Sequence, residues 1–327
     1  MYLQTLSEGS CNACSGNFAS GGVARRAVYL RGQSIIEYVL IIAVIGLVIV
    51  FAGPGVAGAI RNQFNLVGNT VNNGTSGGVE SGGATGGGST GADSTTVQAA
   101  VAKDAKDWTL EEQKAVAEDI AKNGTASPAY AKAKAAMDAG TKFSVKLTNG
   151  KTLEYRIVGI NHDDLADCSG KAGLTFEATN NVLGVQRTNA TDSNVGGWEK
   201  SELRGRLNSG DLWALLPAEI QSKAKAVTKM TDNKGGGSAG TPSATTDKVF
   251  LLSSTEVWGD MQSDGTQYEY YKSKGVTTSN YSGASSSGDH WTRSVRPSYS
   301  TNFCYVISRG DYNSAPYASY VHPAFSF

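Results

Sequence analysis

The longest apolar stretch of the chain runs from Ile35 to Ile60, and Glu37 is the single charged residue among its 26 positions. A helix of about 20 apolar residues crosses a bilayer, so this stretch is long enough for a transmembrane helix. Three arginines precede it between residues 25 and 31, and such residues stay on the cytoplasmic side of a membrane. The pattern therefore predicts that the chain after Arg61 is exported.

Beyond this helix the apolar periodicity disappears. From Asn72 to Thr96 almost every residue is Gly, Ser, Thr, Ala or Asn. Such a composition cannot bury enough apolar surface to order itself, so we expect a flexible linker over residues 72–100.

Helical signals follow at residues 101–141. Thr109 to Glu112 has the form of a capping box, which predicts a helix through Lys122 that ends at Gly124. Ser127-Pro128 predicts the start of a second helix, which runs through Met137 and ends at Gly140. We expect both helices of this helical spacer to pack on the domain that follows.

Alternating, strand-like patterns dominate residues 142–327. Thr148-Asn149-Gly150 separates two such segments and is typical of a β-hairpin turn. The predicted strands are Lys142–Leu147, Thr152–Ile160, Lys248–Ser253, Trp291–Ser294, Phe303–Ile307 and Tyr320–Phe327; the predicted helices are Trp198–Leu207 and Pro217–Ala224; Gly235–Thr246 is predicted as an exposed loop. Short strands mixed with a few helices indicate an α+β domain.

Charge and cysteine content narrow the possible functions. The chain carries 29 basic and 29 acidic residues, so its overall charge gives no indication of nucleic-acid binding. Cys11 and Cys14 form a lone C-x-x-C without the second ligand pair that a zinc site needs. Cys168 and Cys304 are candidates for a disulfide in an oxidising compartment, although a sequence cannot show whether they lie close together.

The apolar segment departs from an ordinary secretory signal. Its small residue, Gly32, precedes the apolar run instead of following it, and Glu37 lies inside the run. A lone charge in a membrane costs about 2.5–3.5 kcal/mol, so the carboxylate needs a partner. The octapeptide Arg31-Gly-Gln-Ser-Ile-Ile-Glu-Tyr38, followed by Val-Leu-Ile-Ile, resembles the prepilin signature of tight-adherence (Flp-type) pilins.

This resemblance implies a processing route. Residues 1–32 would be a leader that a prepilin peptidase removes after Gly32, leaving Gln33 as the new N-terminus of a pilin helix over residues 33–71. Glu37 and Tyr38 would serve assembly with other copies of the chain into a homopolymer. The protein would reside in the inner (cytoplasmic) membrane before assembly and in an extracellular pilus or at the cell surface afterwards. An uncleaved signal anchor is the alternative interpretation.

A second resemblance covers residues 143–327. Its motifs, in order, are Gly159-Ile-Asn-His-Asp-Asp164, Gly170-Lys-Ala-Gly-Leu-Thr-Phe176, Val195-Gly-Gly-Trp198, Leu251-Leu-Ser-Ser-Thr-Glu-Val-Trp-Gly259, Gln267-Tyr-Glu-Tyr-Tyr271, Trp291-Thr-Arg-Ser294, Asn302-Phe-Cys-Tyr-Val306 and Val321-His-Pro-Ala-Phe325. Together they are similar to a bacterial surface-domain family of unassigned function. That family resembles the C-type-lectin-like fold of formylglycine-generating enzymes and of the variable proteins of diversity-generating retroelements. The resemblance implies that residues 142–327 form a displayed domain with this fold.

The sequence contains no recognisable catalytic or metal-binding motif. His162-Asp163-Asp164 could bind a cation or shuttle protons, but a polar turn that closes a strand explains it as well, and we favour this structural role. His290 and His322 stand in no triad or zinc spacing. The triplets of calcium-dependent lectins are absent. We therefore predict no catalytic residue, no metal and no cofactor.

The tail has an unusual composition, since Ser298 to Tyr320 contains five of the 14 tyrosines of the chain and five serines. Binding loops use this mixture because tyrosine offers a large amphipathic surface with few rotatable bonds. A solvated β-meander, with tyrosines that merely cover the core, is the alternative. Six apolar framework positions, Trp291, Phe303, Val306, Val321, Pro323 and Phe325, alternate with the polar ones. The predicted ligand-binding residues are Tyr299, Tyr305, Arg309, Asp311, Tyr312, Asn313, Tyr317 and Tyr320.

These observations favour a pilin-like adhesin that displays a binding domain, hypervariable or fixed, for an unknown protein or glycan. The resemblance to the variable proteins of retroelements implies a source of variation. Adenine-directed mutagenesis of Asn codons can yield Tyr, Ser, Asp, Asn, Thr and Arg, and all of these residues occur in the tail. A structural pilin that binds no ligand, and a membrane-tethered enzyme that uses His162, are the alternatives.

Overall fold

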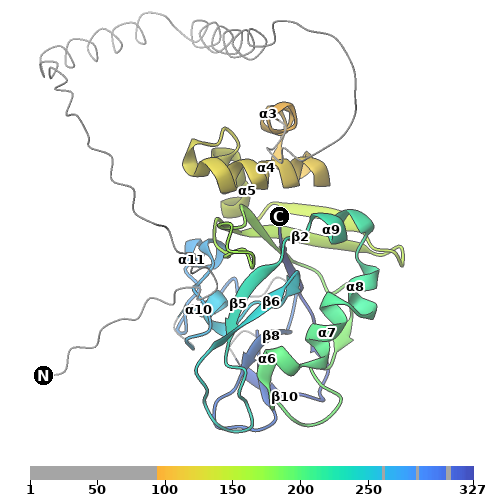
Figure 1. The fold of residues 1–327 in the computed structure, drawn as a ribbon, viewed down its shortest axis with the longest axis vertical. Coiled ribbons are helices and arrows are strands. Elements are labelled where there is room, and N and C mark those ends of the chain that lie inside the picture. The colour runs from red at the N-terminus through yellow and green to blue at the C-terminus, as the bar shows by residue number, and fades with distance from the viewer. Residues whose placement is uncertain (1–93, 260–261, 285–286, 307–310) are drawn as a thin grey trace, which may run out of the picture. The chain divides into compact units, whose positions relative to one another are not determined.

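The computed structural model describes residues 94–259, 262–284, 287–306 and 311–327. Residues Ser89–Phe327 form a compact unit, in which helices and strands share one hydrophobic core (Figure 1). The predicted mixed α+β class is confirmed for this unit. The predicted leader, pilin helix and most of the linker lie outside the described residues. Among the helices that the structure describes, none combines the length and apolar character that crossing a membrane requires.

Of the first three helices of the unit, α4 lies where its capping signals predict it. The helices are α3 (Ser94–Ala102), α4 (Leu110–Asn123), α5 (Tyr130–Ala139), α6 (Gly197–Lys200), α7 (Glu202–Asn208), α8 (Asp211–Leu215), α9 (Ala218–Lys223), α10 (Ser254–Trp258) and α11 (Glu269–Ser273), with 3₁₀ turns at Ala105–Asp107 and Gly124–Ala126. At the start of α4, the Thr109 hydroxyl accepts the Glu112 N–H at 3.2 Å and the Glu112 carboxylate accepts the Thr109 N–H at 2.7 Å. This reciprocal capping box is the predicted one, and α4 ends at Gly124 as expected.

Helix α5 begins later than predicted. The Ser127 hydroxyl accepts the N–H of Ala129 in a turn that precedes the helix, and the helix itself starts at Tyr130. Its predicted end at Gly140 is confirmed, because Gly140 adopts the left-handed conformation (φ 65°) that closes many helices.

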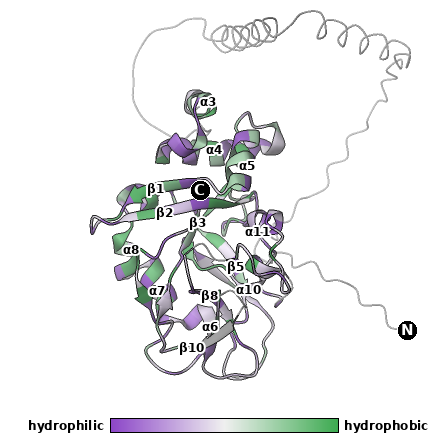
Figure 2. Cartoon of the chain, turned by 180° about the vertical axis from the view of Figure 1, so that it is seen from behind, coloured by the Kyte–Doolittle hydropathy of each residue, from purple (hydrophilic) through white to green (hydrophobic). Residues whose placement is uncertain are grey.

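Helices α4 and α5 pack over the β1–β2 hairpin and α3 packs on α4 (Figure 2), as expected for a spacer that docks on the following domain. Val116 and Ile120 of α4 are fully buried, and the Tyr155 hydroxyl of β2 donates to Gln113 of α4 at 3.0 Å. Helix α3 occupies the end of the segment for which the composition predicts a linker. Val97 and Ala100 of this helix are buried, so its face belongs to the core.

Two five-stranded sheets and one two-stranded sheet form the body. The strands are β1 (Lys142–Lys146), β2 (Thr152–Ile160), β3 (Leu174–Ala178), β4 (Val185–Gln186), β5 (Val227–Thr231), β6 (Ser243–Asp247), β7 (Val249–Phe250), β8 (His290–Val295), β9 (Asn302–Val306), β10 (Asp311–Ser314), β11 (Ser319–Tyr320) and β12 (Ala324–Ser326). The first sheet has the order β1-β2-β3-β12-β7, the second β10-β9-β8-β11-β4, and β5 pairs with β6. The predicted Asn-Gly hairpin joins β1 to β2, with Gly150 at φ 82°.

The last predicted strand, Tyr320–Phe327, is divided between the two sheets. Strand β11 pairs with β8 and β4 in the second sheet, whereas β12 lies between β3 and β7 in the first. Pro323 stands between them, and proline cannot donate to a strand ladder. The C-terminal strand is therefore an interior strand of the first sheet.

The prediction of an exposed loop over Gly235–Thr246 is wrong at its C-terminal end. Ser243–Asp247 forms β6, which pairs along its length with β5. Its polar composition shows no alternation of apolar and polar residues, but Thr245 and Asp247 are buried and form hydrogen bonds. The Thr245 hydroxyl donates to Asp247 at 2.7 Å, and Trp198 Nε1 donates to the same carboxylate at 3.1 Å.

The predicted helix Trp198–Leu207 is interrupted at Ser201. This residue ends α6 and also caps α7, because its hydroxyl accepts the N–H of Arg204 at 3.2 Å. The predicted helix opened by Pro217 is confirmed as α9, with Pro217 at its N-cap.

The possible disulfide between Cys168 and Cys304 is not formed. Cys304 lies on β9 with its side chain in the core, where Gln262 Nε2 approaches its sulfur at 3.5 Å. Cys168 lies in an exposed turn with φ 60°. Burial raises the pKa of the Cys304 thiol to about 12, so this thiol is unreactive as well as unpaired.

Candidate functional site

The framework positions predicted in the tail are core residues. Trp291, Phe303, Val306, Val321 and Phe325 are each at most 1% exposed. They lie on β8, β9 and the segment from β11 to β12, and so they anchor both sheets. Many of the polar residues between them are buried as well, since β8 is buried along its whole length and His322 is 2% exposed.

Three of the predicted ligand-binding tyrosines are exposed. Tyr299, Tyr317 and Tyr320 expose 46%, 62% and 36% of their surface. Tyr305 is different, because it packs edge-on against Trp291 with ring centroids 5.8 Å apart and is partly buried. Its ring packs at the periphery of the hydrophobic core, as expected if the tyrosines of the tail merely cover the core.

The remaining predicted positions lie on or next to β10. Asp311, Tyr312 and Asn313 pair with Tyr305, Cys304 and Phe303 of β9, and the structure describes only the backbone of the three. Arg309 lies outside the described residues. The site therefore combines an edge strand with the neighbouring turns.

Asn194 holds the loop around Tyr299 in place. Its side chain is fully buried and donates to the carbonyl oxygens of Tyr299 and Asn302, both at 2.8 Å, while its Oδ1 accepts the N–H of Gly236 at 2.8 Å. One amide thus joins three loops. The neighbouring Val195 is 64% exposed, and the Arg296 guanidinium stacks 3.9 Å from the Tyr299 ring centroid. Sequence reasoning missed Asn194, whose role depends on loops far apart in the chain.

Tyr317, Tyr320 and Val185 form a second group of exposed apolar side chains, besides the group of Tyr299 and Val195. Tyr320 pairs directly with Val185 of β4, which is 51% exposed. A pocket of about 320 Å³ lies here, lined by Val185, Gln186, Arg187, Ala190, Glu202, Arg206 and Ala318. The backbone of Ala315 connects the segments that carry the two groups. Its N–H donates to the carbonyl oxygen of Thr301 at 2.8 Å, and its carbonyl oxygen accepts the N–H of Thr188 at 3.2 Å.

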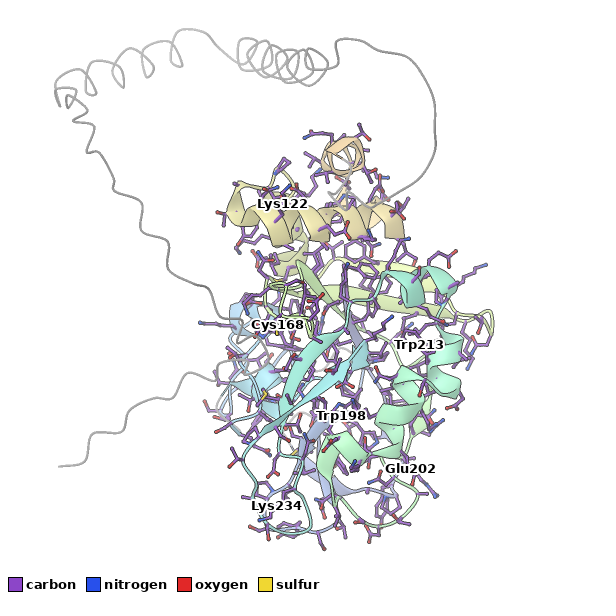
Figure 3. The ribbon with its side chains drawn as sticks, in the orientation of Figure 1. Lys122, Cys168, Trp198, Glu202, Trp213 and Lys234 are labelled. Carbon is purple, nitrogen blue, oxygen red and sulfur yellow. The ribbon has the colours of Figure 1, made fainter. Side chains whose placement is uncertain are left out.

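These surface groups lie away from the helical end of the unit. Figure 1 shows α3 at one end and β10 at the other, and Figure 3 places Lys234 and Glu202 in the half opposite Lys122 of α4. The large apolar side chains exposed among the described residues are Val185, Val195, Met230, Tyr299, Tyr317 and Tyr320. All except Met230 belong to the two groups around the tyrosines.

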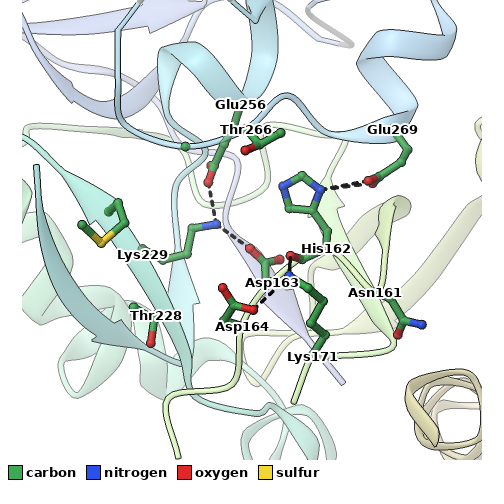
Figure 4. Close-up of a pocket in the computed structure, with 12 residues that line it drawn as sticks. Asn161, His162, Asp163, Asp164, Lys171, Thr228, Lys229, Glu256, Thr266 and Glu269 are labelled. Carbon is green, nitrogen blue, oxygen red and sulfur yellow. Dashed lines mark hydrogen bonds and ion pairs between the residues drawn. The ribbon is translucent and has the colours of Figure 1, made fainter. Parts of the chain in front are cut away.

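The motif His162-Asp163-Asp164 lines a separate polar pocket of about 360 Å³ (Figure 4). His162 follows β2, stacks on the Tyr268 ring at 4.0 Å, and shares a hydrogen bond of 3.1 Å with Glu269. Lys171 Nζ donates to the Asp164 carboxylate at 2.9 Å and to the His162 carbonyl at 3.0 Å. Gly159 permits this packing, because a Cβ there would lie 2.7 Å from Tyr268.

Behind the pocket lies a buried chain of alternating charges. Lys229 Nζ is 2.6 Å from both Asp163 Oδ1 and Glu256 Oε1, and Glu256 forms a two-pronged ion pair with Arg293. These four side chains are at most 3% exposed. Burial raises the pKa of Asp163, but the charges of Lys229 and His162 and the hydrogen bonds from Lys229 and Thr175 together outweigh burial and lower that pKa to about 2. Opposite charges thus compensate each other throughout the network.

His162 Nδ1 and the carboxylates of Asp163 and Asp164 each bind a neighbour within the fold, which is the arrangement that the structural interpretation of the motif predicts. Within residues 94–327, as far as they are described, no three His, Cys, Asp or Glu side chains gather in a way that could hold a metal ion. His290 and His322, which stand in no recognisable site motif, stack on each other at 3.9 Å and are buried.

Comparison with known proteins gives a single family. Residues 173–327 match a family model described as "Domain of unknown function (DUF6273)". No curated protein and no solved structure matches the chain. The matched segment begins at β3 and includes the tyrosine groups, Lys229, Glu256 and Arg293, whereas His162 and Asp163 precede it.

Proposed function

We propose that the chain is a pilin-type surface adhesin. Residues 33–71 would anchor it in the membrane and then assemble it with other copies, and the unit Ser89–Phe327 would be a C-type-lectin-like head that binds a protein or glycan. The observation that carries this proposal is the grouping of exposed tyrosines on a rigid framework. Of the six large apolar side chains that are exposed in the described part of the chain, five belong to these groups, at the end of the unit away from α3.

The site has the properties of a preformed binding surface. Tyrosine and arginine supply much of the energy at protein interfaces, and here Tyr299 and Arg296 stack above loops that Asn194 fixes. A surface held in place before binding loses less conformational entropy when the ligand arrives. An enzymatic role for His162 has less support, because its ring is held by the hydrogen bond with Glu269 and by stacking on Tyr268.

Loss of the exposed tyrosines is expected to abolish binding without unfolding the head. Truncating one hot-spot tyrosine commonly costs about 2 kcal/mol, roughly thirtyfold in affinity. The variant Tyr299→Ser/Tyr317→Ser/Tyr320→Ser should therefore lose a ligand identified on arrays of host glycans and matrix proteins. Its melting temperature should fall by less than about 5 °C, since exposed side chains contribute little stability.

Met230→Ser is the matched control, because Met230 is 40% exposed and lies apart from the tyrosines beside the polar pocket. This variant should keep full affinity. Unchanged binding by the triple variant would place the binding surface elsewhere, and an unfolded triple variant would mean that the tyrosines are structural.

Processing of the N-terminus tests the pilin part of the proposal independently. Mass spectrometry of protein extracted from the cell surface should find Gln33 as the first residue. Glu37→Ala should be processed normally but should fail to form filaments, because the N-terminal amine of the neighbouring subunit loses its buried carboxylate, at a cost of about 3–5 kcal/mol. A mature protein that still carries residues of the leader, or normal filaments from the variant, would contradict the pilin assignment.

A further inference from the structure

Lys229 occupies an unusual position for a lysine. Its ammonium group lies between two carboxylates, 2.6 Å from Asp163 Oδ1 and 2.6 Å from Glu256 Oε1, and its side chain is 2% exposed. The Phe250 and Tyr268 rings, with centroids 4.4 Å and 5.3 Å from Nζ, form apolar walls. A lysine amine is thus held against a carboxyl group in a site with little water.

The Asp163 carboxyl group is also held by hydrogen-bond donors. The Thr175 hydroxyl donates to Oδ2 at 2.6 Å, and the Tyr268 hydroxyl approaches Oδ2 at 2.8 Å and Oδ1 at 3.0 Å. Donors in this position stabilise negative charge that develops on a carboxyl oxygen when a nucleophile attacks its carbon. Asp163 therefore has the surroundings of an electrophile as well as those of an ion-pair partner.

We propose that Lys229 and Asp163 join covalently in the folded protein, forming an amide (isopeptide) bond between Nζ and Cγ with the release of one water molecule. This modification goes beyond the proposed adhesin function and does not depend on it. The reaction needs no oxidant, reductant or activating group, because an ammonium and a carboxylate already contain all the atoms of an amide and a water.

The proton transfers follow from the contacts. Nζ first passes a proton to Asp163 Oδ1 across their 2.6 Å contact, giving a neutral amine and a neutral acid. The charge of Lys229 favours the ionised pair, so this neutral pair is the minor state from which the reaction proceeds. The nitrogen lone pair then attacks Cγ, the carbonyl π electrons move to Oδ2, and Thr175 and Tyr268 stabilise that oxyanion. Glu256, at 2.6 Å, takes a second proton from the nitrogen.

Collapse of this intermediate completes the bond. Glu256 returns its proton to the departing hydroxyl group, the C–O bond breaks, and the C=O bond re-forms, so that the products are an amide with one N–H and a water molecule. Arg293 binds Glu256 from the opposite side and keeps it in position as a carboxylate before and after the reaction. Asp163, Lys229 and Glu256 all line the polar pocket, which gives the water a way out.

The same fold contains a matched pair that should not react. Lys171 Nζ lies 2.9 Å from Asp164 Oδ1, but these side chains are 47% and 67% exposed, and no second carboxylate among the described residues forms an ion pair with this amine. Water stabilises both ions there, so the neutral amine and acid are disfavoured. Asp163 and Asp164 are neighbours in the sequence, and the two pairs thus differ in burial and in the presence of Glu256.

Peptide mapping of the full-length chain tests the bond directly. After denaturation and digestion with trypsin, the peptide Ile157–Lys171, which contains Asp163, should be joined to Ala226–Lys234, with a total mass lower by one water. Trypsin should cut after Lys171 but not after Lys229, because an acylated lysine is no longer a substrate. Fragment ions should assign the link to Asp163 and not to Asp164.

Complete recovery of the two peptides as separate species, with cleavage after Lys229, would overturn the proposal. Glu256→Gln should abolish the link and restore cleavage after Lys229, whereas a linked Glu256→Gln protein would refute the assigned role of Glu256. If that variant does not fold, the peptide map of the unaltered chain still decides whether the bond exists.

Discussion

Replacing Arg293 by methionine is expected to destabilise the unit Ser89–Phe327 by about 3–5 kcal/mol, the cost of breaking a buried ion pair from one side. Arg293 is fully buried and donates to Glu256, to the Thr231 hydroxyl at 2.8 Å and to the Leu251 carbonyl at 3.0 Å. Without it, these acceptors lose a donor in the core. Since domains are stable by only about 5–15 kcal/mol, we expect a large loss of folded protein.

Arg206→Met is the matched control for this prediction. Arg206 also makes a two-pronged ion pair, with Asp211 at 2.8 and 2.7 Å, but the two side chains are 35% and 63% exposed. Exposed pairs contribute at most about 1 kcal/mol. Urea unfolding of both variants, followed by tryptophan fluorescence, measures the difference. Equal and small effects would mean that the buried network does not support the fold.

The elements that sequence reasoning found are those with local signals. The capping box at Thr109, the Asn-Gly turn at residue 149 and the terminator Gly140 each specify a structure through neighbours a few residues away. The alternation of apolar and polar residues also placed Trp291 and Phe303 in the core. Short-range rules sufficed for these parts of the fold.

The parts that sequence reasoning missed depend on contacts between distant residues. Strand β6 is polar and owes its place to partners on β5 and to Trp198, 49 residues away from Asp247. Ser253 and Glu256 form the capping box of α10, which is a local signal. The apolar run that predicts a strand up to Ser253 masks this signal in the sequence. The buried network joins Asp163 to Lys229 across 66 residues, and no local pattern connects them.

Acidification from about pH 6.5 to pH 4 is expected to destabilise the unit through His290 and His322. Their rings stack at 3.9 Å and are 3% and 2% exposed. Burial lowers the pKa of His290 to about 4, and burial together with the charge of His290 lowers the pKa of His322 well below its ordinary value. The guanidinium of Arg156 lowers both pKa values further. His322 Nδ1 is buried and has no hydrogen-bond partner among the described residues, so a proton there would lack an acceptor.

The direction of the effect follows from proton linkage. Below pH 6.5 the unfolded chain binds protons on both imidazoles while the folded unit does not, so stability falls as the pH drops, until His290 itself titrates near pH 4. His290 alone accounts for about 3 kcal/mol over this range. As a free carboxyl group Asp163 has a pKa of about 2, so its stabilising ionisation is lost only below this window, and as an amide it does not titrate at all.

His162 acts in the opposite direction and provides a control. Burial lowers its pKa, but the hydrogen bond with Glu269 and the charge of Asp163 outweigh burial, and the pKa lies above its ordinary value. A raised pKa adds stability at low pH that is lost as the pH rises, so His162 partly offsets the other two histidines. Removing His162 should therefore make the loss of stability in acid larger.

Urea unfolding of the unit at pH 7.0, 5.5 and 4.5 tests these expectations. The unaltered protein should lose stability steadily, His290→Gln/His322→Gln should lose less than half as much, and His162→Gln should lose more. Glutamine keeps hydrogen-bonding capacity at both positions but does not titrate, so the difference between variants isolates protonation from packing. A double variant as sensitive to acid as the unaltered protein would show that other groups govern the response. A constant stability between pH 7.0 and 4.5 would mean that the stacked imidazoles either bind protons in the folded unit or are not buried in solution.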